Sequence, residues 1–209
     1  MSRCWQVGQD LWLGLARCTR WRGEAPGRRW QNDRDAADQA VAAVVAASGL
    51  GPDSCATSRS HTQGVAAAVA APAGVRVGVD LVPIDRVSRR HAETVLSSRE
   101  WASLAAYSSV RPALAWALKE SAAKASGDPR GCFPHGLRIE SGPAGLMVRQ
   151  VADGGVTLAA GWRLFGGLLC GWVMESPDPS NLATRELTPH ASPSGRPPRP
   201  SSKSSSISS

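Results

Sequence analysis

Residues 75–87 read VRVGVDLVPIDRV, and residues 116–127 read WALKESAAKASG. In the first stretch, the β-branched residues of 75–82 predict a buried strand. The second stretch belongs to a helix predicted over 111–126, with Pro112 in its first turn and Gly127 just past its end. An aspartate in a buried strand is costly to desolvate unless it is paired or holds a metal. Asp80 is therefore the first candidate functional residue.

The flanking sequence predicts further helices and strands. An alanine-rich segment with an acidic first turn predicts a helix over 33–47, and a longer helical stretch is expected over 85–107. Short apolar runs bounded by glycine-containing turns predict strands over 64–70, 137–140, 146–151, 155–160 and 168–174. This order predicts an α+β protein with antiparallel strands.

Composition divides the chain into three parts. Residues 1–73 are expected to form a shortened, divergent N-terminal half, and residues 74–175 a similar C-terminal half that carries the functional residues. Residues 176–209 are rich in proline and serine and have no apolar periodicity, so a disordered tail is expected there.

The composition also excludes several classes of protein. Hydrophobic residues make up 42% of the 209, which is enough for a folded core, and five scattered cysteines indicate neither a disulfide scaffold nor a zinc site. With no signal peptide and no apolar run of about 20 residues, we expect a cytoplasmic protein that does not enter a membrane.

The net charge of +7 favours an acidic partner. Only three of the 24 basic residues are lysine, and two of these are Lys119 and Lys124.

Asp80, Glu120 and Lys124 are the candidates for chemistry. Glu120 and Lys124 are four residues apart, so they share one face of the predicted helix, and taken alone this spacing favours an ordinary surface pair. Asp80 could equally cap a turn. Together, the two carboxylates would suit Mg²⁺, with Mn²⁺ as the alternative, and Lys124 would add a positive charge for phosphate. Ser60 and His61 precede an apolar strand and would suit an anionic ligand, although a lone histidine is often only structural.

Three motifs in this order resemble the 4′-phosphopantetheinyl transferase superfamily. They are S-x-S-H at Ser58–His61, V-G-V-D at Val77–Asp80, and W-x-L-K-E-S-x-x-K at Trp116–Lys124. The resemblance covers roughly residues 55–175. It implies transfer of the 4′-phosphopantetheine arm of coenzyme A to a serine of an acidic acyl or peptidyl carrier protein, with release of adenosine 3′,5′-bisphosphate.

The resemblance also implies roles for individual residues. Asp80 and Glu120 match the metal-binding acids, and Glu120 also matches the base for the carrier serine. Lys124 matches a lysine that contacts the pyrophosphate and helps to activate the serine. The coenzyme A contacts are expected from Ser60, His61, Lys119, Lys124 and Arg34.

The sequence departs from the family pattern in two places. Many larger members carry a third metal acid two residues after the aspartate, where this chain has Val82, which suggests that a water takes that coordination position. Residues 30–41 faintly resemble W-x-x-x-R-x-A-A-K through Trp30 and Arg34, but Asp38 stands in place of the lysine, and Arg28, Arg29 or Arg34 could substitute for it.

Length favours the larger, single-chain type with two pseudo-symmetric halves, which is expected to be monomeric. Two alternatives remain open. One is a nucleic-acid-binding protein, suggested by arginines interleaved with Trp5, Trp12, Trp21 and Trp30. The other is a decayed transferase that keeps the fold without the activity.

Overall fold

The computed structural model describes residues 2–18, 26–127, 133–142, 145–151 and 155–175, and only the backbone of residues 26–30. The predicted tail, 176–209, lies outside these residues. Within the described part of the chain, no helix is long and apolar enough to cross a lipid bilayer.

Two antiparallel sheets form the centre of the molecule, and the predicted α+β class is confirmed. The first sheet has the strand order β1-β2-β4-β3, and the second has the order β5-β9-β8-β7-β6. The strands of the first sheet are β1 (Arg3–Gly8), β2 (Leu11–Arg17), β3 (Cys55–Thr62) and β4 (Val65–Pro72). Those of the second are β5 (Val77–Pro83), β6 (Leu137–Gly142), β7 (Gly145–Gln150), β8 (Thr157–Phe165) and β9 (Leu168–Glu175).

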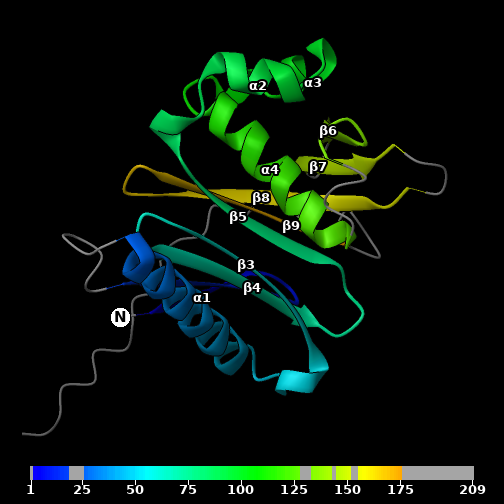
Figure 1. The fold of residues 1–209 in the computed structure, drawn as a ribbon. Coiled ribbons are helices and arrows are strands. Elements are labelled where there is room, and N and C mark those ends of the chain that lie inside the picture. The colour runs from blue at the N-terminus through cyan, green and yellow to red at the C-terminus, as the bar shows by residue number, and fades with distance from the viewer. Residues whose placement is uncertain (1, 19–25, 128–132, 143–144, 152–154, 176–209) are drawn as a thin grey trace, which may run out of the picture.

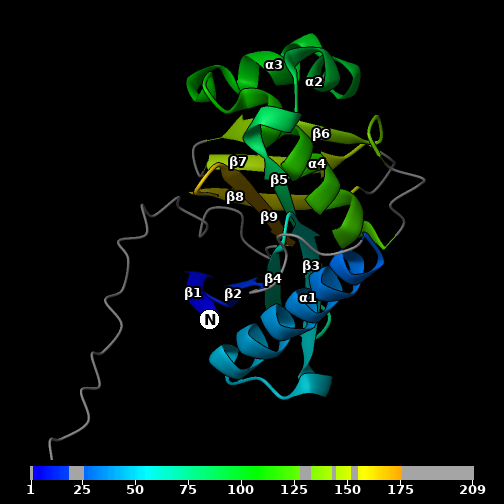
Figure 2. The ribbon, with the colours of Figure 1, turned by 60° about the vertical axis from the view of Figure 1, so that its left-hand side comes forward.

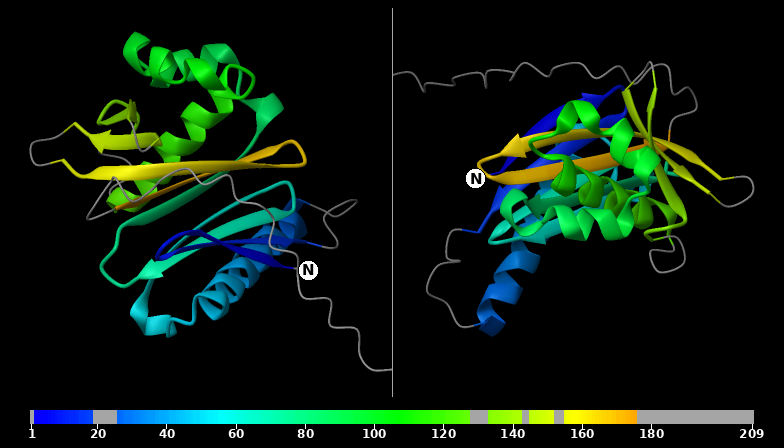
Figure 3. Two further views of the ribbon diagram at one scale, coloured as in Figure 1. Left: turned by 180° about the vertical axis from the view of Figure 1, so that it is seen from behind. Right: turned by 90° about the horizontal axis from the view of Figure 1, so that it is seen from above.

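The sheets pack face to face, with one long helix outside each. Helix α1 (Pro26–Ser48) covers the first sheet and α4 (Arg111–Ser126) covers the second, so that the layers run helix, sheet, sheet, helix (Figure 1 and the left view of Figure 3). Apolar side chains from both sheets, including Leu13, Val69, Val79 and Trp172, form the core between the sheets. Two further cores lie under α1 and under α4.

The strands predicted from residue 64 onward are confirmed within a few residues, but β1, β2 and β3 were not predicted. Strand β2 lacks the alternation of a half-exposed strand because both of its faces are covered. Leu11 and Leu13 enter the core between the sheets, while Gly14 and Ala16 lie under α1. Strands buried on both faces read as continuous apolar runs.

The helix predicted over 33–47 is confirmed, and it begins earlier, at Pro26. The prediction of one continuous helix over 85–107 is wrong, because the segment contains two short helices, each of which begins at a capping serine. Ser88 caps α2 (Arg89–Val95), Leu96 is extended, and Ser97 caps α3 (Ser98–Ser103) in a capping box with Glu100. Short 3₁₀ turns complete the connections, at η1 (Pro52–Ser54), η2 (Ile84–Arg86) and η3 (Ala105–Tyr107). Figure 2 shows α2 and α3 beyond α4, at the end of the molecule farthest from α1.

Helix α4 has the predicted limits and packs unusually close to the second sheet. A Cβ atom on Gly78 of β5 would lie 1.8 Å from the carbonyl oxygen of Ser121, so no larger residue fits there. The Ser121 hydroxyl lies 2.9 Å from the carbonyl oxygen of Gly171 on β9. This close contact sets the distance between α4 and Asp80, two residues after Gly78.

Candidate functional site

Asp80 lies in β5 and is buried beside α4. Its Oδ1 atom lies 2.8 Å from Nζ of Lys124 on α4 and accepts a hydrogen bond of 2.8 Å from the hydroxyl of Ser60 on β3. Lys124 also donates to the carbonyl oxygen of Val79, at 2.9 Å. The structure therefore brings together Asp80, Lys124 and Ser60 from three elements that are far apart in the sequence.

Glu120 lies one helical turn before Lys124 and is half-buried. Burial raises the pKa of Glu120, the negative charge of Asp80 raises it further, and Lys124 opposes both effects. The two carboxylates thus share one region with a single lysine. A cation placed between them would relieve this repulsion.

Two serines of β3 join the sheets beside Asp80. The hydroxyl of Ser58 accepts a hydrogen bond from the backbone N–H of Val79, and that of Ser60 accepts one from Leu81, each at 3.2 Å. Strand β5 is at the edge of its sheet, so these side chains satisfy N–H groups that a neighbouring strand would otherwise bind. This role of Ser58 is not among the predictions from the sequence. The signal was the S-x-S spacing, which puts both hydroxyls on one face of a strand.

His61 follows Ser60 on β3 and is partly exposed, with its Nδ1 atom 3.8 Å from Oδ2 of Asp33 on α1. Asp33 also accepts a hydrogen bond of 3.1 Å from the backbone of Gly64, which ties α1 to the β3–β4 turn. The sequence alone does not single out Asp33. Its position in the first turn of a predicted helix indicated only a favourable helix start.

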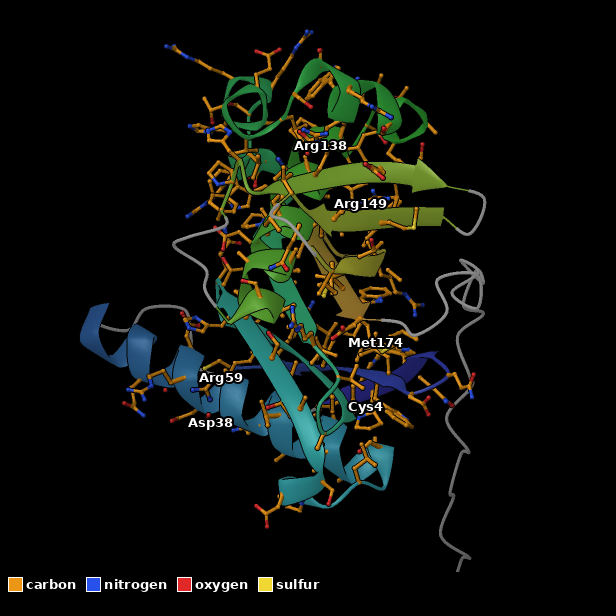
Figure 4. All side chains as sticks on the ribbon, turned by 90° about the vertical axis from the view of Figure 1, so that its right-hand side faces the viewer. Cys4, Asp38, Arg59, Arg138, Arg149 and Met174 are labelled. Carbon is orange, nitrogen blue, oxygen red and sulfur yellow. The ribbon has the colours of Figure 1, made fainter. Side chains whose placement is uncertain are left out.

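Asp38, which stands where the family pattern has a lysine, forms an ion pair with Arg59 of β3. The two side chains point toward each other across the gap between α1 and β3 (Figure 4). Arg34 is exposed on the same helix. The side chains of Arg28, Arg29 and Trp30 lie outside the described part of the structure.

Lys119 is not part of the group around Asp80. Its side chain is 1% exposed and its Nζ lies 2.8 Å from Oε1 of Glu100 on α3. It also donates to the backbone carbonyl oxygens of Val95 and Pro134. Burial lowers the pKa of Lys119, and the pairing with Glu100 opposes that effect.

The donor atoms of the site fit a hard cation such as Mg²⁺, because both acidic side chains offer carboxylate oxygens. In the described residues, no group of three or more histidine, cysteine, aspartate or glutamate side chains could hold a metal. Val82, at the position of the third family acid, is buried in the core under α4. Asp80 and Glu120 would therefore be the protein ligands, with water and phosphate oxygens completing the shell.

The tryptophans suggested for nucleic-acid binding are partly accounted for by packing. Trp5 stacks on Phe165 at a ring distance of 5.3 Å and contacts Arg163, and Trp12 packs against the core under α1. Trp21 lies outside the described residues, as does the side chain of Trp30. Trp5 and Trp12 thus have structural partners inside the molecule.

Comparison with known proteins identifies one family. The family model of the 4′-phosphopantetheinyl transferase superfamily matches residues 76–153, which contain β5, α2, α3, α4, β6 and β7. Asp80, Lys119, Glu120 and Lys124 all lie within the matched segment, while Ser60, His61 and Arg34 precede it. No curated protein matches the chain.

Proposed function

Because residues 76–153 match the family model of the 4′-phosphopantetheinyl transferase superfamily, we propose that the chain loads a carrier protein. It would transfer the 4′-phosphopantetheine arm of coenzyme A to a serine of an apo acyl or peptidyl carrier protein and release adenosine 3′,5′-bisphosphate. The observation that carries the proposal is the contact between Asp80 and Lys124, with Glu120 one turn away on α4. These are the charged groups that a phosphoryl transfer needs in one place.

Asp80 and Glu120 would hold Mg²⁺ or Mn²⁺, which would polarise the pyrophosphate and stabilise the leaving bisphosphate. Their carboxylates lie where the edge of the second sheet meets α4, and Glu120 already has a raised pKa because of burial and the charge of Asp80. Ser60 and Lys124 both contact Oδ1 of Asp80, so they would keep this carboxylate in one orientation.

In the reaction, Glu120 would accept the proton of the carrier serine, directly or through a water. The serine oxygen then forms a bond to the phosphorus that carries the pantetheine arm, while the bond from that phosphorus to the bisphosphate oxygen breaks. Lys124 has three N–H donors and directs two of them to described residues, so the third would be the one to contact a pyrophosphate oxygen. Of the other residues implied by the resemblance, Ser60, His61 and Arg34 would line the coenzyme A site.

An acidic carrier protein would dock on the segment that follows β5. Four arginines are exposed there, namely Arg86, Arg89, Arg90 and Arg99, against the two exposed acids Asp85 and Glu93. We expect the paired change Arg86→Glu/Arg90→Glu to raise the KM for the carrier and leave the KM for coenzyme A unchanged. Arg3→Glu, an exposed arginine of β1, is the matched control. Equal effects of both changes on the carrier KM would contradict docking at this segment.

We also propose the larger, single-chain organisation, with halves over 1–73 and 74–175 and a monomeric enzyme. The site supports it, because Ser60 of the first sheet contacts Asp80 of the second within one chain. Asp80, Glu120, Lys124 and Ser60 would all be supplied by one copy of the chain. Size-exclusion chromatography with light scattering would test the monomer.

The decisive experiment is incubation with coenzyme A, Mg²⁺ and a panel of apo carrier proteins, followed by intact mass measurement of each carrier. We expect the mass gain of one phosphopantetheine arm, abolished when the carrier serine is replaced by alanine. No gain on any carrier, in a chain that still binds Mg²⁺, would favour the decayed transferase. Tight, salt-sensitive nucleic-acid binding without any gain would favour the other alternative.

A further inference from the structure

We infer that the buried ion pair between Lys119 and Glu100 is a positioning device, which holds α4 so that Glu120 and Lys124 meet Asp80. The inference rests on the function proposed for this site. It gives Lys119 a role that acts through its helix and requires no contact with coenzyme A.

The pair forms a closed network. Lys119 directs its three N–H donors to Oε1 of Glu100 and to the carbonyl oxygens of Val95 and Pro134. Glu100 accepts further hydrogen bonds from the backbone N–H of Ile139, at 3.0 Å, and from the backbone and hydroxyl of Ser97, each at 2.8 Å. The side chains of Lys119 and Glu100 are 1% and 5% exposed. No donor of Lys119 is left for a ligand.

Stability alone does not explain a charged pair at this position. Two charges removed from water recover at best part of their desolvation cost through mutual attraction, and apolar residues of similar volume are often as stable or more stable. The pair lies beside apolar core residues: Leu118 precedes Lys119 in α4, and Ile139, whose backbone N–H binds Glu100, is fully buried. What the ion pair adds is direction, because each of its hydrogen bonds needs a particular donor geometry.

The network anchors the face of α4 opposite to the close contact with β5. Through Lys119, α4 is tied to the end of α2, to α3 and to the segment before β6. On its other side, Ser121 packs against Gly78 and Gly171. Contacts on both of its sides hold α4 against sliding or rotation. Glu120 directly follows Lys119 in the helix, so its position is held as well. A shift of about 1 Å in a catalytic group can cost roughly 100-fold in rate.

The test is the double change Lys119→Met/Glu100→Met, which removes both charges and retains side-chain volume. Thermal unfolding should show that the double variant is at least as stable as either single variant. We expect kcat to fall about tenfold or more, and Mg²⁺ binding measured by calorimetry to weaken by about tenfold, as seen when supporting contacts of a metal site are removed. The KM for coenzyme A should stay the same. Wild-type kcat and Mg²⁺ affinity in the folded double variant would overturn the inference.

Val44→Ala is the matched control, because Val44 is fully buried in the core under α1. It should lower the thermal unfolding temperature without changing kcat or Mg²⁺ affinity, and a loss of both would mean that instability alone explains the effect. If the double variant does not fold, Glu100→Gln is measured in the same way, and unchanged kcat and Mg²⁺ affinity would again overturn the inference. Absence of both transfer and Mg²⁺ binding in the unaltered chain would instead overturn the proposed function, and this inference with it.

Discussion

The two outer helices, α1 and α4, are both rich in alanine, yet they use charge in opposite ways. Helix α1 packs alanines against the first sheet and, among its described side chains, keeps Arg34, Asp35 and Asp38 exposed, the last paired with Arg59. In helix α4, the side chain of Lys119 is fully buried, and Lys124 forms an ion pair with the buried Asp80. Exposed pairs change stability little, whereas buried charges require defined partners. This difference supports the proposal that the chemistry lies on α4.

The largest effect should come from a change at Asp80, which lies in the second sheet and binds Ser60 of the first. Asp80→Asn keeps the size of the side chain but removes the charge that pairs with Lys124. We expect kcat/KM to fall by about 100-fold to 1,000-fold, the range seen when one electrostatic contact to a transition state is removed. Steady-state carrier loading measures this change. Asp53→Asn, an exposed aspartate of η1, is the control, and a similar loss in both variants would contradict the assignment of Asp80.

Ser58 and Ser60 offer a sharper comparison, because each accepts one backbone N–H of β5 and only Ser60 also contacts Asp80. Ser58→Ala and Ser60→Ala should each cost about 1 to 3 kcal/mol of unfolding free energy, the penalty for a buried donor left without a partner. Ser60→Ala should in addition lower kcat by about tenfold, because the Asp80 carboxylate loses one of its supports. Urea unfolding and carrier loading measure the two effects. Equal kcat values in the two variants would show that the hydroxyl of Ser60 does not orient Asp80.

The raised pKa of Glu120 predicts a pH-dependent cost in stability when no divalent cation is present. Below the pKa of the unfolded chain, the carboxyl is protonated in both states and has no effect. Between that pKa and the higher folded pKa, the folded state holds more protons, so stability falls as pH rises. Glu120→Gln removes this slope, and it should therefore gain stability relative to the unaltered chain across that window.

Thermal unfolding in a chelating buffer between about pH 4 and pH 8 checks this prediction, since the ordinary glutamate pKa is about 4.3. Added Mg²⁺ should then stabilise the unaltered chain more than the Glu120→Gln variant, because binding to the folded state stabilises it. Parallel pH profiles in the two proteins would contradict the prediction.

The smallest effect is expected from the surface pair of α1. Asp38 and Arg59 are 64% and 46% exposed, so Asp38→Asn should change the unfolding free energy by less than about 1 kcal/mol. Urea unfolding at low and high salt measures it, and a larger loss would show that α1 relies on this pair more than its exposure suggests. Asp35→Asn, an exposed aspartate on the same helix, serves as the control.

Local patterns predicted those parts of the fold that have local causes. Helix α4 was predicted with its observed limits, because Pro112 and Gly127 mark its start and stop. The break between α2 and α3 was missed, although the capping serine and glutamate, Ser97 and Glu100, are three residues apart in the sequence. Strand β2 was missed because both of its faces are covered, which removes the alternation that identifies a strand.

The sequence by itself determined the residue types and spacing of the site: an aspartate in an apolar strand, and a glutamate and a lysine one turn apart on a helix. Only the tertiary structure decided that Ser60 binds Asp80 from the other sheet, and that two lysines five residues apart do different things. The physical reason is that helical spacing puts Lys119 and Lys124 on different sides of α4. The side with Lys119 packs into a closed core, and the side with Lys124 contacts the edge strand β5. Both contacts are made by elements distant in the sequence.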